Sequence, residues 1–254
     1  MSCRKVLIAL GALIAVCGGS LMTEAKQAPR SQPQKYISQA EFTSKSTPRD
    51  FVPDGNLDKP AWRQGTWVKV DRDAFRSVTH PQSATEIASL WTPGYVYFAY
   101  RCQYTSLNLF EAKDPGKEFW TLWERDVVEV FLNPQPERMK HYYEFEVAPN
   151  NLWIDLEIDF DKSPFNDAKW DSGFEHATYV NPAKHVWACE LRIPVAGLKD
   201  TKPIEANAEW RINFFRCDGE GHDAQRRLLA WSPVHSDSHS FHSPWSFGII
   251  RFVK

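Results

Sequence analysis

The sequence predicts an all-β protein, an antiparallel β-sandwich of jelly-roll type with about ten strands. Three observations support this prediction. Apolar and polar residues alternate along short segments, turn-forming residues separate these segments, and helical periodicity is nearly absent. Of the 254 residues, 43% are hydrophobic and 14% are aromatic, which is enough apolar material for one sizeable core. A sandwich is the arrangement that buries the apolar faces of such strands against each other.

The N-terminus carries the pattern of a targeting segment. Arg4 and Lys5 precede the apolar stretch Val6–Cys17, which is too short to span a bilayer comfortably and is typical of a secretory signal peptide. Cleavage is expected after Ala25, so residues 1–25 would form the signal peptide. The mature protein is therefore expected to be secreted or periplasmic, with no membrane span.

Residues 26–35 are polar and contain proline without periodicity, so we expect a flexible linker there. The folded domain is expected to occupy residues 36–254. Cys17 raises a lipoprotein anchor as an alternative to secretion, but Val16 is larger than the small residue that usually precedes a lipidated cysteine.

Strand-like alternation is clearest near residue 190, where Trp187, Cys189 and Leu191 share one face and Ala188 and Glu190 share the other. A period of two with one apolar side predicts a sheet that is covered on one face only. Ten segments have strand-like patterns: 67–70, 85–91, 95–102, 127–132, 141–150, 153–160, 185–194, 209–217, 227–231 and 247–253.

Three cysteines lie outside the predicted signal peptide, at Cys102, Cys189 and Cys217. Each lies in an apolar, strand-like segment, and an odd number leaves at least one thiol free. A domain of this size does not need a covalent cross-link to be stable. We therefore expect small buried hydrophobic residues rather than a disulfide.

The charge balance and the motifs exclude several function classes. Thirty Lys and Arg against 32 Asp and Glu give a net charge of −2, so no long-range attraction to nucleic acid or anionic membranes is expected. The sequence has no GxSxG, P-loop, GxGxxG or HExxH motif, and no catalytic residue is predicted. A glycoside hydrolase needs only two carboxylates, so this enzyme class stays open as an alternative.

Four carboxylates recur at every second position of one segment, at Asp155, Glu157, Asp159 and Asp161. On a strand they would share one face about 6.6 Å apart, where like charges repel unless they are solvated or share a cation. They are the sequence's candidates for structural calcium. The alternative is an exposed acidic face opposite a buried apolar one.

The chain is rich in aromatic residues, with 11 Trp and 16 Phe. Most are expected in the core, but Trp123, Phe241 and Trp245 lie in polar, turn-like surroundings. An exposed aromatic ring can stack on the apolar face of a pyranose, while nearby polar groups bind its hydroxyls. Packing at the edge of the sandwich is the alternative for each ring.

Five segments in a fixed order carry a resemblance to a known family: DGNLDKPAW (54–62), LWTPGYVYFAYRC (90–102), WERDVVEVFLNP (123–134), YYEFEVAPNN (142–151) and FHSPWSFGIIRF (241–252). Together they resemble the family 9 carbohydrate-binding modules and their free-standing relatives in bacterial secreted proteins. The resemblance implies a jelly-roll sandwich that binds saccharides without cleaving them and supports polysaccharide capture or breakdown. It also implies structural calcium.

In such modules a sugar lies between two aromatic rings with polar groups around its hydroxyls. The resemblance implies these ligand-binding residues: Trp123, Phe241, Glu129, Arg125, Glu146 and Trp245. Three positions depart from the family pattern, and one of them is Ser238, which stands where the sugar-binding modules have an asparagine. The second ring, Phe241, would be tryptophan, and Glu146 stands where the sugar-binding modules have an arginine.

Overall fold

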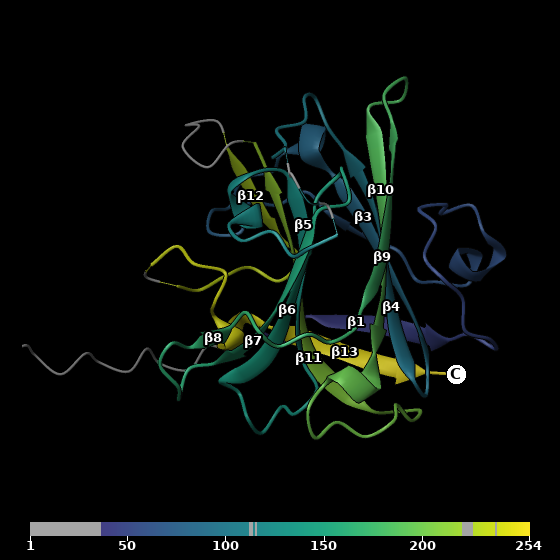
Figure 1. Cartoon of the computed structure of the whole chain (residues 1–254), viewed down its shortest axis with the longest axis vertical. Coiled ribbons are helices and arrows are strands. Elements are labelled where there is room, and N and C mark those ends of the chain that lie inside the picture. Colours follow the sequence, from purple (N-terminus) through teal and green to yellow (C-terminus); the bar gives the residue numbers. More distant parts are fainter. Residues whose placement is uncertain (1–36, 112–113, 115, 220–225, 237) are drawn as a thin grey trace, which may run out of the picture. The chain divides into compact units, whose positions relative to one another are not determined.

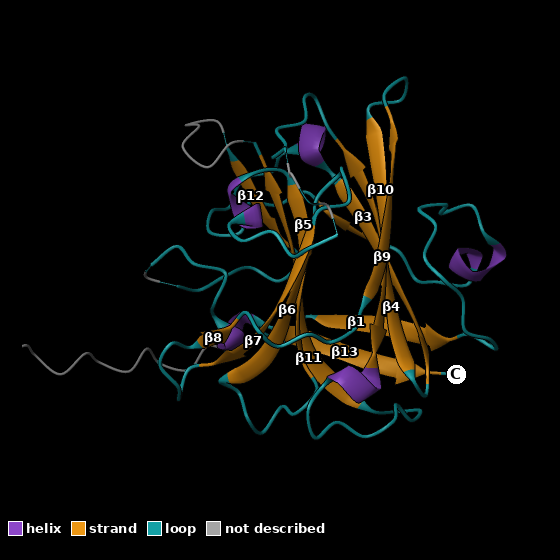
Figure 2. Cartoon of the chain, in the orientation of Figure 1, coloured by secondary structure: helices purple, strands orange, loops and turns teal. Residues whose placement is uncertain are grey.

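The computed structural model describes residues 37–111, 114, 116–219, 226–236 and 238–254 (Figure 1). The predicted signal peptide and linker lie outside these residues. Within them the regular structure is strands and short 3-10 helices (Figure 2). No helix in these ranges is long and apolar enough to cross a membrane. The strands are β1 (Glu41–Ser46), β2 (Val68–Val70), β3 (Thr85–Thr92), β4 (Tyr95–Gln103), β5 (Val127–Asn133), β6 (His141–Val147), β7 (Trp153–Asp159), β8 (Asn166–Asp167), β9 (Glu175–Asn181), β10 (Val186–Pro194), β11 (Glu209–Asp218), β12 (Arg227–Ala230) and β13 (Gly248–Val253). The 3-10 helices are η1 (Pro60–Arg63), η2 (Pro81–Ser83), η3 (Leu122–Glu124), η4 (Val195–Gly197) and η5 (Pro244–Ser246).

The strands form one continuous hydrogen-bonded path in the order β8-β7-β6-β5-β11-β13-β1-β3-β4-β10-β9, with β12 on β11 and β2 on β3. We call β8, β7, β6, β5, β11 and β12 the first half-sheet, and β2, β3, β4, β10 and β9 the second. Figure 1 shows β5 and β6 beside β4, β9 and β10, with β1 and β13 crossing below and joining the two halves. The all-β sandwich prediction is confirmed, and each of the ten predicted strands is present.

The main core lies between the half-sheets. Val128 and Val130 of β5 share one buried cluster with Tyr100 of β4 and Trp187 of β10. The ring of Phe214 on β11 lies 6.1 Å from that of Tyr100, edge to face. The Tyr100 hydroxyl donates a 3.0 Å hydrogen bond to the Glu129 carbonyl, so polar as well as apolar contacts connect the two layers.

One strand departs from the antiparallel prediction. β1 runs parallel to β13, with Phe42 opposite Ile250, and also parallel to β3. The sequence of β1, EFTSKS, shows little apolar alternation. Its inward-facing residue Ser44 is polar, yet it is buried and forms a 2.8 Å hydrogen bond with Ser89. The strand was therefore absent from the predicted set, as were β8 and the half-exposed β9.

A second departure concerns the faces of the sheet. The alternation predicted one covered face, yet each residue of β5 and β6 is buried. The outer face of the first half-sheet carries its own apolar cluster, which includes Phe131, Tyr142 and Phe215. Leu122 of η3 and the loop residue Phe247 cover this face, and polar side chains there are enclosed rather than solvated.

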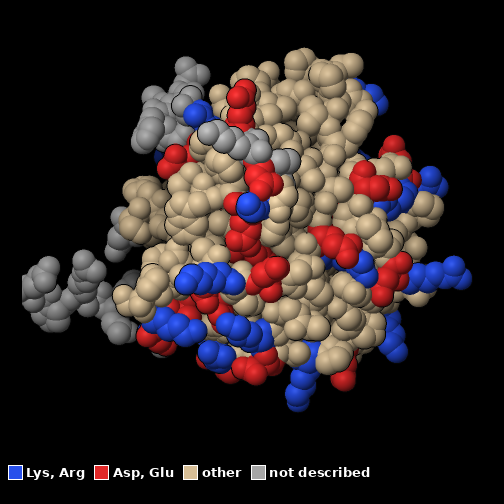
Figure 3. All heavy atoms as spheres, viewed as in Figure 1, with Lys and Arg blue, Asp and Glu red and all other residues tan. Residues whose placement is uncertain are grey.

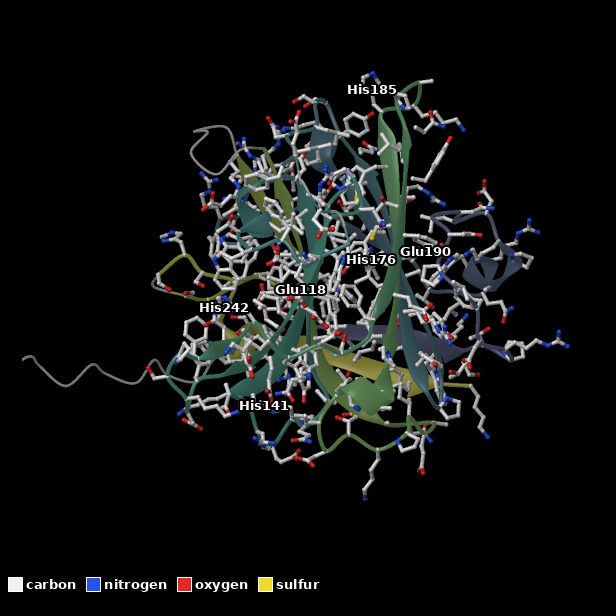
Figure 4. The ribbon with its side chains drawn as sticks, in the orientation of Figure 1. Glu118, His141, His176, His185, Glu190 and His242 are labelled. Carbon is white, nitrogen blue, oxygen red and sulfur yellow. The ribbon has the colours of Figure 1, made fainter. Side chains whose placement is uncertain are left out.

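The outer face of the second half-sheet is also covered, by the segment around Trp62. Glu190 of β10 is fully buried and accepts hydrogen bonds from the Trp62 indole (2.6 Å) and the Gly55 amide (2.8 Å). It also pairs with Lys59 at 2.9 Å. Gly55 has a φ of +79°, and a Cβ there would lie 2.9 Å from the Thr178 carbonyl carbon. Through these contacts the motif DGNLDKPAW holds this segment against β10. Figure 4 labels Glu190 on that strand.

The three cysteines that lie outside the predicted signal peptide, Cys102, Cys189 and Cys217, are free and buried. This confirms the prediction that they act as small core residues. On the face seen in Figure 3 acidic side chains form a central band and basic side chains adjoin it, so the two signs lie side by side.

Candidate functional site

A pocket of about 300 Å³ opens on the outer face of the first half-sheet. Loops around β5, β6, β7 and β11 form its walls, and the strands themselves form its floor. The lining residues are Trp120, Trp123, Glu129, Phe131, Glu144, Leu156, Phe165, Asn166, Cys217, Arg226, Leu228, His239, Ser240, Phe241 and His242. We call this the aromatic pocket.

Trp123 forms one wall and lies on η3. Its neighbour Leu122 is fully buried, which anchors the short helix and leaves the indole of Trp123 half-exposed. The Arg226 guanidinium donates a hydrogen bond to the Trp123 carbonyl. The ring of Trp120 meets that of Trp123 edge to face, with centroids 5.0 Å apart. The wall is therefore a pair of tryptophans rather than one.

Asp126 holds the loops of this wall together. Its buried carboxylate accepts hydrogen bonds from the backbone amides of Asn108 (2.9 Å) and Gly219 (2.5 Å). Burial raises the pKa of Asp126 to about 6, against the opposing effect of these two donors. In the motif WERDVVEVF the tryptophan is thus in the pocket wall, the aspartate fixes loops, and Glu129 reaches the floor.

Phe241 forms another wall. One face of its ring stacks on Phe215 of β11, with centroids 4.1 Å apart and planes 10° from parallel, and Phe75 lies nearly parallel at 5.8 Å. Phe241 is thus held by core aromatics. Next to it, His242 Nδ1 lies 2.7 Å from the Tyr142 hydroxyl, and Figure 4 marks His242 at this end of the first half-sheet.

Three buried carboxylates, which we call the glutamate cluster, lie at the floor (Glu129 and Glu144) and just beneath it (Glu146). Glu129 on β5 is paired with Glu146 on β6, and Glu144 lies two residues before Glu146 on the same face. One carboxylate oxygen from each lies within 4.8 Å of the others. Among the described residues, these three glutamates are the group of acidic, histidine or cysteine side chains whose ligand atoms lie close enough together to hold a metal ion.

Burial dominates the electrostatics of this cluster. It raises the pKa of Glu129 to about 8, with a further contribution from the charge of Glu144. Burial also raises the pKa of Glu146 well above its ordinary value, and both neighbouring glutamates add to the effect. The Cys217 thiol donates a 3.2 Å hydrogen bond to Glu129. The floor therefore favours a positive charge.

Of the six ligand-binding residues predicted from sequence, Trp123, Phe241 and Glu129 line the aromatic pocket. Glu146 lies beneath its floor, within the glutamate cluster. Arg125 and Trp245 are not among the lining residues. The Arg125 guanidinium lies over the Phe110 ring at 4.9 Å, and the Trp245 indole donates a 3.1 Å hydrogen bond to the His235 carbonyl.

The four calcium candidates have separate partners instead of one shared centre. Asp155 accepts hydrogen bonds from the amide and hydroxyl of Ser172. Glu157 lies between His141 and Lys199, with His141 Nε2 at 2.7 Å. Asp159 pairs with Lys162 at 3.3 Å and Asp161 with Lys140 at 2.7 Å. Asp155, Glu157 and Asp159 are buried, so the alternative of an exposed acidic face is wrong for them.

Several pocket residues were missing from the predicted site, among them Trp120, Glu144, Arg226, His239 and His242. Glu144 had a detectable signal, because a period of two places it on the face of Glu146. Arg226 had none, since its role depends on β12 returning beside β11.

A β-sandwich with a small pocket that combines aromatic walls and a polar floor has the architecture of a carbohydrate-binding module. The sequence profile of the family described as "Carbohydrate family 9 binding domain-like" matches residues 53–254. The chain belongs to this family, which confirms the resemblance seen in the sequence.

Three known proteins extend the comparison. A protein of Arthroderma benhamiae named "Extracellular protein" is 28% identical over 166 residues, which are 57% of this chain and 72% of that protein. A Bacteroides uniformis structure, provisionally assigned to carbohydrate binding, has a TM-score of 0.67 at 17% identity and covers 85% of this chain and 100% of its own. A family 9 module of Caldicellulosiruptor kristjanssonii, solved with cellotriose, has a TM-score of 0.60 at 19% identity. The match covers 84% of this chain and 94% of that module's chain. At these identities the two structures establish the shared fold.

Proposed function

We propose that the chain is a non-catalytic saccharide-binding protein and that the aromatic pocket is its binding site. The observation that carries the proposal is the meeting of Trp123, Phe241 and Glu129 in one pocket, although the first two are 118 positions apart in the sequence. Aromatic rings offer a platform for the apolar face of a pyranose, and carboxylates accept hydrogen bonds from its hydroxyls.

The size of the pocket fits a small ligand. Its volume of about 300 Å³ lies at the lower end of the range for small-molecule sites. Stacking contributes on the order of 1 kcal/mol per ring beyond the effect of area burial. A pocket with few rings therefore predicts weak to moderate affinity, with one or two sugar units inside it.

Glucose and cellotriose are the first ligands to test. The Caldicellulosiruptor kristjanssonii module was solved with each of them. Saccharide binding by this chain would occur outside the cytoplasm. Arg4 and Lys5 followed by an apolar stretch support export, and so does the name of the Arthroderma benhamiae relative. Its role there would be to capture polysaccharide or its fragments.

Calorimetric titration of the purified chain with glucose, cellotriose and a panel of other oligosaccharides tests the proposal. We expect saturable binding of at least one saccharide, and a loss of about tenfold or more in affinity in Trp123→Ala. The matched control is Tyr179→Ala, because Tyr179 is 58% exposed on β9 and lines a different pocket. No binding of any saccharide, or equal losses in the two variants, would overturn the proposed site.

A glycoside hydrolase is the second candidate, favoured by the buried carboxylates of the glutamate cluster. The elevated pKa of Glu129, about 8, is a property that a general acid requires. Retaining hydrolases, however, place their two carboxyl groups about 5 to 5.5 Å apart across the sugar. Glu129, Glu144 and Glu146 converge on one point beneath the pocket, which fits binding better. Release of reducing sugar by the wild type, abolished in Glu129→Gln, would instead establish the hydrolase.

A further inference from the structure

The glutamate cluster gathers three carboxylates where few donors reach them. Glu129, Glu144 and Glu146 are 2%, 3% and 0% exposed. One oxygen from each lies within 4.8 Å of the other two. Carboxylates this close repel each other strongly away from water, and burial of uncompensated charge costs free energy. Such an arrangement needs positive charge at its centre, either as bound protons, which the raised pKa values of Glu129 and Glu146 indicate, or as a cation that displaces these protons.

Hydrogen bonds do not supply that charge. Glu129 accepts from the neutral Cys217 thiol. Both carboxylate oxygens of Glu146 and Oε2 of Glu144 have no hydrogen-bond partner within the described part of the chain. Because Glu146 is fully buried and has an oxygen within reach of the other two carboxylates, its side chain is directed into the cluster.

Arg226 compensates only part of the negative charge. Among the described residues that line the aromatic pocket, it is the one Lys or Arg side chain. Its guanidinium donates to the Trp123 carbonyl. The imidazole of His242 also lies near the cluster, with Nε2 3.9 Å from Glu144 Oε2. If this imidazole is counted as neutral, three ionised glutamates and one arginine leave two negative charges, which match a divalent cation.

We infer that Glu129, Glu144 and Glu146 form a divalent-cation site with calcium as its favoured occupant. Calcium binds oxygen ligands at about 2.3–2.6 Å, so two ligand oxygens of one ion lie at most about 5.2 Å apart. The 4.8 Å limit of the cluster satisfies this condition. The Cys217 sulfur is not part of the group, so its ligands are hard oxygens, which favour calcium over zinc.

The position of the site gives the ion access to the pocket. Glu129 and Glu144 line the aromatic pocket, and Glu146 lies below them. Calcium takes six to eight oxygen ligands, so the carboxylates would hold it from below and its remaining positions would face the pocket. This cation site is distinct from Asp155, Glu157, Asp159 and Asp161, and it does not depend on saccharide binding.

Calorimetric titration of chelator-treated, desalted full-length protein with calcium, magnesium and zinc chloride tests the inference. We expect one calcium per chain, bound on the order of tenfold or more tightly than magnesium, and a higher thermal midpoint with calcium. Glu146→Gln keeps the shape of the side chain and should weaken calcium binding by about 100-fold. Asp161→Asn should bind calcium as the wild type does, because this carboxylate is exposed and pairs with Lys140.

No binding of any of the three ions to the wild type would overturn the inference. Calcium binding retained in Glu146→Gln, or lost in Asp161→Asn, would also overturn it. Circular dichroism checks that the variants fold, and Glu144→Gln replaces Glu146→Gln if the latter does not. Saccharide titrations with calcium and with chelator are read separately, so failure of the proposed sugar site does not decide the cation site.

Discussion

Glu129 of β5 and Glu146 of β6 face each other directly across two antiparallel strands, and both side chains are buried. Directly opposed residues of such strands have Cβ atoms about 4.5–5.5 Å apart, where like charges destabilise a sheet. A pair of this kind weakens the fold unless a ligand compensates for it. The opposition of these two carboxylates is the observation behind the cation site that we infer at the floor of the aromatic pocket.

This opposition predicts that Glu129→Gln stabilises the protein when divalent cations are removed. The amide removes one charge and can still accept the Cys217 hydrogen bond. Above the Glu129 pKa of about 8, the free energy of unfolding should rise by about 1 kcal/mol, measured by denaturation in chelator. The control Glu86→Gln changes a half-exposed carboxylate, and a lower midpoint for Glu129→Gln alone would contradict this reasoning.

A different buried glutamate should behave in the opposite way. Glu190 accepts hydrogen bonds from the Trp62 indole and the Gly55 amide and pairs with Lys59. Glu190→Ala leaves these donors without their acceptor and loosens the segment around Trp62. We expect the free energy of unfolding to fall by about 3 kcal/mol or more, measured by urea denaturation.

The control for this variant is Glu86→Ala. Glu86 pairs with Arg101 across β3 and β4, but its side chain is 49% exposed, so its loss should change stability by less than about 1 kcal/mol. Equal effects of the two substitutions would show that Glu190 does not anchor the segment.

Period-two patterns predicted much of this fold. The faces assigned to Trp187 and Leu191 lie in the main core, and Val128 and Val130 face the same core. The strand β1 was not predicted because its buried residue Ser44 is polar and hydrogen-bonded, and a pattern of apolar residues does not reveal a buried polar residue. Alternation also could not reveal the covering of the outer faces, because this depends on where distant loops return.

The candidate site divides in the same way. Motif order identified Trp123 and Glu129, because both lie on or near one strand. The contribution of Arg226 depends on β12 pairing with β11, and the packing of Phe241 depends on its stack with Phe215. The acidic row that includes Asp155 looked solvated because its partner Ser172 comes from another segment.

The stability of the protein should depend on His176. This residue of β9 packs its ring 5.4 Å from that of Trp153 and 5.1 Å from that of Phe174. Burial lowers the pKa of His176 from 6.5 to about 4. The unfolded chain takes up a proton near pH 6.5, but the folded chain does so only near pH 4, so the free energy of unfolding declines as the pH falls between these values.

His176→Phe keeps an aromatic ring and removes this titration. Urea denaturation at several pH values should show a shallower decline for the variant than for the wild type within that window. The comparison of slopes isolates this histidine from the carboxylates that titrate in the same range. Parallel slopes would contradict the lowered pKa of His176.

Trp120 is expected to contribute to the binding of saccharides although no sequence pattern selected it. Its side chain is 47% exposed, lines the aromatic pocket and meets Trp123 edge to face at 5.0 Å. Trp120→Ala removes a ring from the wall and leaves Trp123 less restrained. The loss of stacking predicts about a fivefold weaker affinity, on the order of 1 kcal/mol, measured by calorimetry with the best ligand of the panel. The unfolding midpoint should change little, because the ring is half outside the core; a large drop in stability with unchanged affinity would instead identify Trp120 as a packing residue.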